Sequence, residues 1–229
     1  MSKFFAFAAA LLLVFAPIVH AQEKHSDAEV LLFETDHLKE ITQPTVLQYE
    51  FRKDGALERG FEDKVSVNIS KVGNEGKTVS ADYLSGERKT DFPAVENASG
   101  NPVVMYFLER DIREMQRLTG GKPPYFKKRI RLSLVDGAEV RPVKFSFDGR
   151  EIEGKEIKII PYANDPLKAR FGKYVGKYYL FTLAEDVPGG VYQMRAIIPE
   201  QASPDGAKSR PMIEETLTFS KASNLVAGK

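Results

Sequence analysis

The sequence predicts a mainly β protein in which a curved antiparallel sheet, or half-barrel, of about nine strands packs on one long helix. Short segments of alternating apolar residues recur along most of the chain, which is typical of half-buried strands. Hairpin-length turns such as Lys53-Asp54-Gly55 join most of these segments, and such turns connect antiparallel neighbours. The helix, residues 101–119, comes after three strands, so we expect its apolar stripe to fill the concave side of the sheet.

The N-terminus predicts a signal peptide over residues 1–21. Lys3 supplies a positive charge, and residues 4–15 form an apolar run that is too short to span a bilayer comfortably. Val19-His20-Ala21 places small or tolerated residues at the positions that a signal peptidase recognises, so we expect cleavage after Ala21. The protein is therefore expected in the periplasm, and no later stretch is apolar enough to predict a transmembrane segment in the mature chain.

Composition limits the classes of partner. Removal of residues 1–21 removes one lysine and no acid, so 32 basic residues would face 32 acidic ones. This balance argues against a nucleic-acid partner held by bulk charge. The chain has no cysteine, but it is long enough to bury a core without disulfides. We expect one domain over residues 22–222 and a flexible tail over residues 223–229.

The first predicted strands cover residues 46–51, 61–72 and 78–84. The second alternates most clearly, with Val65, Val67 and Ile69 on one face. The helix follows. Asn101 is a suitable N-cap residue, Pro102 suits the first helical position, and Gly120-Gly121 ends the periodic segment.

The later part of the chain predicts six more strands. The first covers residues 126–134, because Phe126, Ile130, Leu132 and Leu134 would share one face. The others cover residues 143–147, 157–159, 178–183, 191–198 and 213–219. Residues 189–192 read Gly-Gly-Val-Tyr, and a Gly-x-Tyr entering a strand resembles the tyrosine corner of immunoglobulin-like sandwiches. A β-sandwich in the C-terminal half is therefore the alternative fold.

Asp111 is the unusual residue of the helix. At about 100° per residue it falls among the apolar side chains rather than on the charged face. An unpaired carboxylate there would be costly, so we expect it to bind a donor or to be held neutral. A structural ion pair is favoured, with Lys128 as the best local partner. The functional alternative makes Asp111 a polar anchor in a pocket under the helix.

Catalytic and metal-binding patterns are poorly represented. Only His25 and His37 would remain after cleavage, no histidine or cysteine pair has the spacing of zinc ligands, and no GxSxG motif occurs. The sequence therefore identifies no catalytic residue, metal site or cofactor.

Residues 161–181 combine aromatic and basic side chains. An exposed patch of Tyr162, Arg170, Phe171, Tyr174 and Lys177 could contact a sugar, a lipid headgroup or a protein. The favoured interpretation is that the aromatic residues pack on the sheet while the lysines face water.

The order of elements carries a resemblance. A signal peptide, three strands, a helix ending in Gly-Gly and further antiparallel strands resemble the half-barrel of the lipoprotein-localisation (LolA/LolB-like) superfamily. The run NPVVMYFLERDIREMQRLTGG also looks like uncharacterised exported proteobacterial proteins. The superfamily implies a curved sheet that holds helices over an apolar cavity, and no binding residue is carried over from it.

These observations favour a non-catalytic exported binding protein for a lipid or another apolar ligand between helix and sheet. The expected lining residues are Phe107, Leu108, Asp111, Met115, Phe126, Lys128, Phe145 and Phe147. A closed, ordinary core made by the same residues is an alternative that the sequence favours at least as much. The second hypothesis is a cell-envelope protein-interaction module. The third is an acid-dependent hydrolase, for which Glu114 is the only helical carboxylate near Asp111.

Overall fold

The computed structural model describes residues 25–73, 76–200 and 210–225. The predicted signal peptide and its cleavage site lie outside these residues. Within them, no helix is sufficiently long and apolar to cross a membrane.

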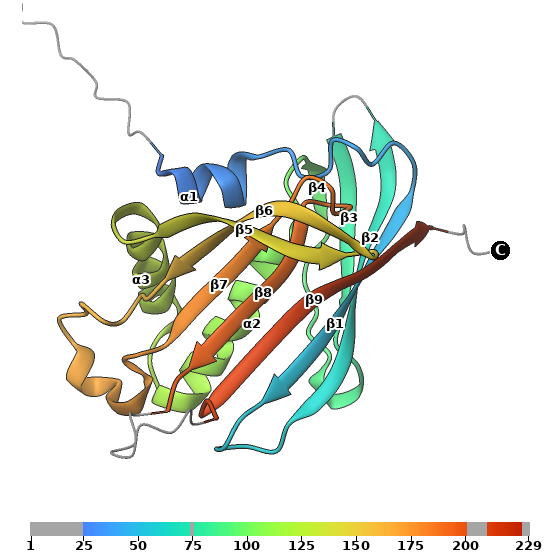
Figure 1. Cartoon of the computed structure of the whole chain (residues 1–229). Coiled ribbons are helices and arrows are strands. Elements are labelled where there is room, and N and C mark those ends of the chain that lie inside the picture. The colour runs from blue at the N-terminus through green and yellow to red at the C-terminus, as the bar shows by residue number, and fades with distance from the viewer. Residues whose placement is uncertain (1–24, 74–75, 201–209, 226–229) are drawn as a thin grey trace, which may run out of the picture.

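The described residues form one nine-stranded sheet in which every neighbouring pair is antiparallel. Its order is β4-β3-β2-β1-β9-β8-β7-β6-β5, so two meanders meet where β1 pairs with β9 (Figure 1). Among the described residues, β4 and β5 are the two edges and the curved sheet stays open. The strands are β1 (Thr45–Asp54), β2 (Phe61–Gly73), β3 (Gly76–Tyr83), β4 (Val95–Ala98), β5 (Glu139–Phe147), β6 (Arg150–Ile159), β7 (Tyr178–Leu183), β8 (Val191–Ile198) and β9 (Ile213–Asn224).

The predicted half-barrel is confirmed, and the sandwich alternative is wrong. β7, β8 and β9 continue the sheet that contains β1 to β4 instead of forming a second layer. Tyr192 stacks on Phe145 with ring centroids 4.2 Å apart, and Phe147 lies 5.8 Å from Phe219. β5 therefore bends across one end of β8 and β9, as Figure 1 shows.

The central pairing extends further than the sequence predicts. β1 and β9 pair from Asp54 opposite Glu214 to Thr45 opposite Asn224, with a register shift between Gln48 and Tyr49. Ser223 and Asn224, predicted to begin a tail, are therefore strand residues.

Two long helices, α2 (Val103–Thr119) and α3 (Pro123–Asp136), connect the meanders and lie against one face of the sheet (Figure 1). The N-cap position of α2 is Pro102, one residue later than the sequence predicts, and Asn101 Oδ1 accepts a hydrogen bond of 3.1 Å from the Val103 amide at the start of the helix. Gly120 ends α2 in the left-handed conformation, with φ of +69°. Shorter helices are α1 (Asp27–Glu29), η1 (Val30–Glu34), η2 (Gly86–Arg88), η3 (Lys168–Arg170) and η4 (Gly172–Tyr174).

The predicted strand over residues 126–134 is wrong, because this segment is part of α3. Phe126, Ile130 and Leu134 are buried, and their spacing of four residues places them on one face of a helix. Leu132, which a strand would also bury, is 37% exposed. The expected count of about nine strands still holds because β4 replaces the lost one.

Candidate binding pocket at one end of the sheet

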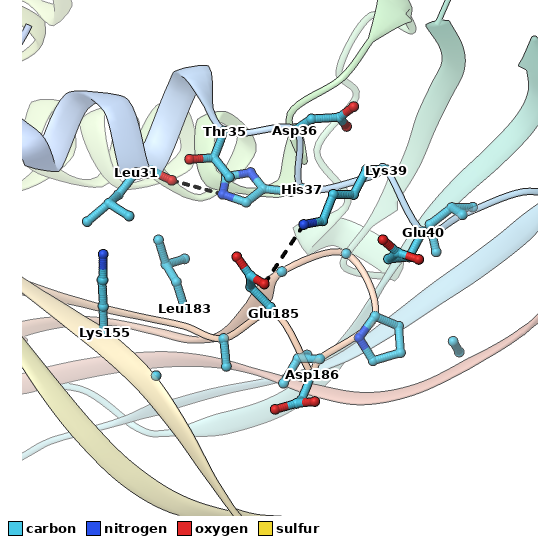
Figure 2. Close-up of a pocket in the computed structure, with 18 of the residues that line it drawn as sticks. Leu31, Thr35, Asp36, His37, Lys39, Glu40, Lys155, Leu183, Glu185 and Asp186 are labelled. Carbon is cyan, nitrogen blue, oxygen red and sulfur yellow. Dashed lines mark hydrogen bonds and ion pairs between the residues drawn. The ribbon is translucent and has the colours of Figure 1, made fainter. Parts of the chain in front are cut away.

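A pocket of about 1050 Å³ opens at the end of the sheet where β5 bends over its neighbours. One side is residues 31–45, named here the N-terminal wall. The others are the β5–β6 hairpin, the β7–β8 turn (residues 184–190) and the end of β9. Figure 2 shows the N-terminal wall facing the β7–β8 turn across this space.

The lining of the pocket is amphipathic. Its apolar side chains are Leu31, Ile41, Pro142, Val143, Leu183, Ala184, Val187, Pro188 and Ala222. Its charged side chains are Asp36, Lys39, Glu40, Lys144, Glu153, Lys155, Glu185 and Asp186. Lys39 Nζ lies 3.8 Å from Glu185 and joins the N-terminal wall to the β7–β8 turn, whereas Lys144 Nζ lies 3.2 Å from Glu153 within the β5–β6 hairpin. Such exposed pairs are weak, so their charged groups can also contact a ligand.

His37 lies at the centre of the N-terminal wall and is 9% exposed. Its Nε2 lies 2.9 Å from the Leu31 carbonyl oxygen, and its Nδ1 accepts from the Asn101 amide at 3.3 Å. These contacts define a neutral ring with its proton on Nε2. Burial lowers the pKa of His37 below its ordinary value, against the opposing effects of the Leu31 carbonyl and Asp36.

The β7–β8 turn packs directly on this histidine. Gly190 has φ of +71°, and a Cβ there would lie 2.8 Å from His37 Cδ2. Asn101 Nδ2 donates to the Gly189 carbonyl and to the Tyr49 hydroxyl, both at 2.9 Å. Because Asn101 Oδ1 also accepts from the first amide of α2, one buried cluster joins the N-terminal wall, the β7–β8 turn, β1 and α2.

Asp111 is buried as its helical position predicts, but its predicted partner is wrong. Lys177 Nζ lies 2.5 Å from Asp111 Oδ1, and the Tyr179 hydroxyl donates to Oδ2 at 2.5 Å. Lys128 is exposed on α3. Burial, reinforced by the Asp111 charge, raises the pKa of Tyr179 well above its ordinary value. Asp111 is thus held by a buried ion pair within the fold.

The other predicted lining residues belong to the core or to its margin. Phe107, Leu108, Met115 and Phe126 are buried between helices and sheet, whereas Phe145 and Phe147 are half-buried on β5. None of these residues lines the pocket of about 1050 Å³. A second, polar pocket of about 830 Å³ also receives no residue from α2 and is formed by β1, β2, β8 and β9.

Glu114, the second carboxylate of the hydrolase hypothesis, belongs to a different network. Lys53 Nζ lies 2.7 Å from Glu114 and 2.7 Å from Glu58, and Arg117 also donates to Glu114 at 2.8 Å. Burial alone would raise the pKa of Glu114, but the hydrogen bonds from Arg117 and Lys53 outweigh it and lower the pKa to about 2. Asp111 and Glu114 therefore each have their own cations.

Most residues of the aromatic and basic patch considered in the sequence analysis are not exposed. Tyr162, Phe171 and Lys177 are buried, Tyr174 is half-buried, and Arg170 is exposed. Tyr162 and Phe171 stack with ring centroids 5.1 Å apart. The hypothesis of an exposed patch is therefore wrong. Its aromatic members pack into or against the core, as the favoured interpretation expected, but Lys177 is buried with them.

The pocket residues carry no recognisable motif in the sequence. The sequence of residues 31–45 indicates only a short strand and a helical turn. These residues form a wall of the pocket because they face residues 184–190, and no local pattern indicates this contact. The Pro188-Gly189-Gly190 turn was the one visible signal, since it indicates a tight approach of backbone to a neighbour. Within the described segments, no group of three or more His, Asp or Glu side chains could hold a metal ion.

Fold and pocket together define an open antiparallel half-barrel with an amphipathic pocket at one end. Among solved structures, lipoprotein LppX of Mycobacterium tuberculosis is similar at 13% identity and a TM-score of 0.38, over 88% of this chain and 99% of that one. A LolA superfamily protein from Nitrosomonas europaea is similar at 12% identity and a TM-score of 0.25, over 88% and 94%. LprF from Mycobacterium bovis is similar at 11% identity and a TM-score of 0.34, over 89% and 96%.

No protein-family model matches the chain, and no curated protein matches its sequence. At such low identities and TM-scores, no ligand or activity is carried over to this chain.

Proposed function

We propose that this protein is a non-catalytic binding protein that holds an amphipathic ligand with an acyl-like apolar part in the pocket at the end of the sheet. The observation that carries the proposal is the pocket itself. Its volume of about 1050 Å³ suits a lipid-sized ligand, and its lining combines apolar side chains with exposed charged ones. The site proposed here replaces the predicted space between α2 and the sheet.

The polar groups of the pocket support binding over catalysis. His37 has both ring nitrogens engaged with main-chain groups, so it is poorly placed to act as a general base. Asp111 and Glu114 lie outside the pocket and are paired with cations. The apolar lining and the exposed charges suit recognition of an acyl chain and a polar headgroup, respectively.

The signal peptide expected over residues 1–21 supports an exported location for this binding protein. The first experiment is native mass spectrometry of the mature protein from its exporting host, followed by extraction with organic solvent. A reproducible bound mass that partitions into the solvent is the expected result. A protein without bound mass would favour the envelope interaction module instead.

A pocket-blocking variant tests the location of the site. Ala222 lines the pocket on β9 and is exposed, so Ala222→Trp should fill the space without disturbing the core. Lys221→Trp is the matched control, because neighbouring strand residues point to opposite faces. The chain has no tryptophan of its own, so each variant also carries a single fluorescent reporter.

We expect Ala222→Trp to weaken binding of a dansyl-labelled fatty acid by about tenfold or more. Lys221→Trp should bind as the unchanged protein does. Equal affinity for both variants, or no binding to the unchanged protein, would overturn the proposed function.

A further inference from the structure

We infer that His37 is a proton-operated latch, and that its protonation loosens the wall of the pocket and releases the ligand. This inference rests on the proposed function, because it assigns a regulation to the same pocket. It follows from the contacts of one buried ring with three separate parts of the chain, which Figure 2 shows in part.

The described contacts fit only the neutral form of His37. The Asn101 amide points its hydrogen at Nδ1 across 3.3 Å, so Nδ1 must offer a lone pair. Nε2 carries the proton and donates to the Leu31 carbonyl at 2.9 Å. A second proton would have to go to Nδ1, where it would face the hydrogen of the Asn101 amide. Two donors cannot share this bond, so the ring and the Asn101 backbone must separate.

That separation would reach both walls of the pocket. His37 belongs to the N-terminal wall, and Gly190 of the β7–β8 turn lies so close to its side chain that a Cβ there would be 2.8 Å from His37 Cδ2. Asn101 in turn holds the Gly189 carbonyl at 2.9 Å. Moving the ring away from Asn101 therefore loosens the packing of His37 on Gly190, which holds the N-terminal wall against the β7–β8 turn.

The charges around the ring favour a protonated histidine once it leaves the buried position. On its own segment these charges are Asp36, Lys39 and Glu40, and on the β7–β8 turn they are Glu185 and Asp186. β1 contributes Tyr49, whose pKa burial raises, so it is neutral. Residues 99–101 carry no titratable side chain, and Glu34 of η1 is hydrogen-bonded to His25. A protonated His37 that moves out of its buried position would therefore meet more acidic side chains than basic ones on these two segments. In the buried position, burial disfavours the protonated ring.

Nuclear magnetic resonance tests the latch without any ligand. After cleavage at Ala21 the chain would contain only His25 and His37, so two imidazole signals can be assigned with His25→Gln. We expect His37 to titrate below its ordinary value of 6.5, and the amide signal of Asn101 to move with the same midpoint. In His37→Gln the Asn101 amide should not titrate. An Asn101 amide that stays fixed while His37 becomes charged would overturn the latch.

Ligand release is tested with the dansyl-labelled fatty acid used above. We expect its affinity for the unchanged protein and for His25→Gln to fall about tenfold or more between about pH 7.5 and about pH 5. His37→Gln, or His37→Asn if the first variant does not fold, should lose this dependence. An equal fall in the His37 variants would overturn the latch and leave the proposed function intact. If the probe binds at no pH, the proposed function fails, and the Asn101 titration still decides whether the latch exists.

Discussion

Lys177 Nζ lies 2.5 Å from the Asp111 carboxylate, and both side chains are almost completely buried between α2 and β7. The pair joins the helix to the sheet across 66 residues of sequence. A buried ion pair need not exceed a hydrophobic pair in stability, but removal of one partner leaves an uncompensated charge in the core.

We therefore expect Lys177→Met to lower the free energy of unfolding by about 3–5 kcal/mol, measured by urea denaturation. Asp111→Asn combined with Lys177→Met should be less destabilised than Lys177→Met alone, because Asn still accepts from Tyr179 and no charge remains. Lys128→Met is the control, and this exposed residue should change stability by less than about 0.5 kcal/mol. A lower free energy of unfolding in the double variant than in Lys177→Met alone would contradict the ion-pair explanation.

Glu114 should make stability depend on acid pH. Its pKa is about 2 in the folded protein against 4.5 unfolded, so its contribution is complete above about pH 4.5 and is lost as the pH falls towards 2. The contribution is on the order of 3 kcal/mol, since each unit of pKa corresponds to about 1.4 kcal/mol. Glu215 acts in the opposite direction, because burial raises its pKa despite Arg110.

Chemical denaturation between about pH 5 and about pH 2 checks this prediction. Glu114→Gln should lose stability at the upper end of this window and show a flatter profile across it. Glu87→Gln, on the exposed η2 turn, should keep the profile of the unchanged protein. A Glu114→Gln profile as steep as that of the unchanged protein would place the acid sensitivity elsewhere.

Gly189 is expected to be more sensitive than its backbone conformation alone requires. Its φ is +79°, and a Cβ would lie 2.5 Å from Leu47 Cδ1 and 2.9 Å from Asn101 Nδ2. Gly149 has a similar φ of +73° but meets nothing within 4 Å. Gly149→Ala should therefore show only the backbone strain, about 1 kcal/mol. Gly189→Ala should lose clearly more in thermal denaturation, and equal losses would mean that the packing around Asn101 adapts easily.

The assignment of α3 can be tested with one pair of leucine and phenylalanine substitutions. Phe126 is fully buried, so Phe126→Ala should cost about 3–5 kcal/mol in the free energy of unfolding. Leu132→Ala should cost much less, because a helix turns this residue outward. A strand would bury both side chains, and comparable losses in urea denaturation would favour that alternative.

The helix of residues 101–119 was predictable because its signals are local. Asn101, Gly120 and the apolar stripe lie within one segment, and the same periodicity placed Asp111 inside. The partner of Asp111 is not evident from the sequence, because Lys177 stands among the aromatic and basic residues of the segment 161–181, where a lysine is expected to face water. Lys177 lies one residue before β7 and is in phase with Tyr179 and Phe181, and all three side chains are buried.

The second helix and the pocket were missed for different reasons. Residues 126–134 carry apolar residues that fit both a period of two and a period of four, and only the exposure of Leu132 separates them. The pocket depends on which distant segments meet. Nothing near His37 indicates that residues 184–190 will pack on it, because that contact is set by the order of strands in the sheet.

The pairing of β1 with β9 also determines when the protein can finish folding. The first strand made has its second neighbour at the other end of the chain, so Thr45 must wait until Asn224 has been synthesised. Contacts between such distant residues form slowly, because a long loop must close before they contribute. For a chain that is exported, this delay would keep the central strand of the sheet incomplete while the polypeptide still has to pass through a membrane in an extended state.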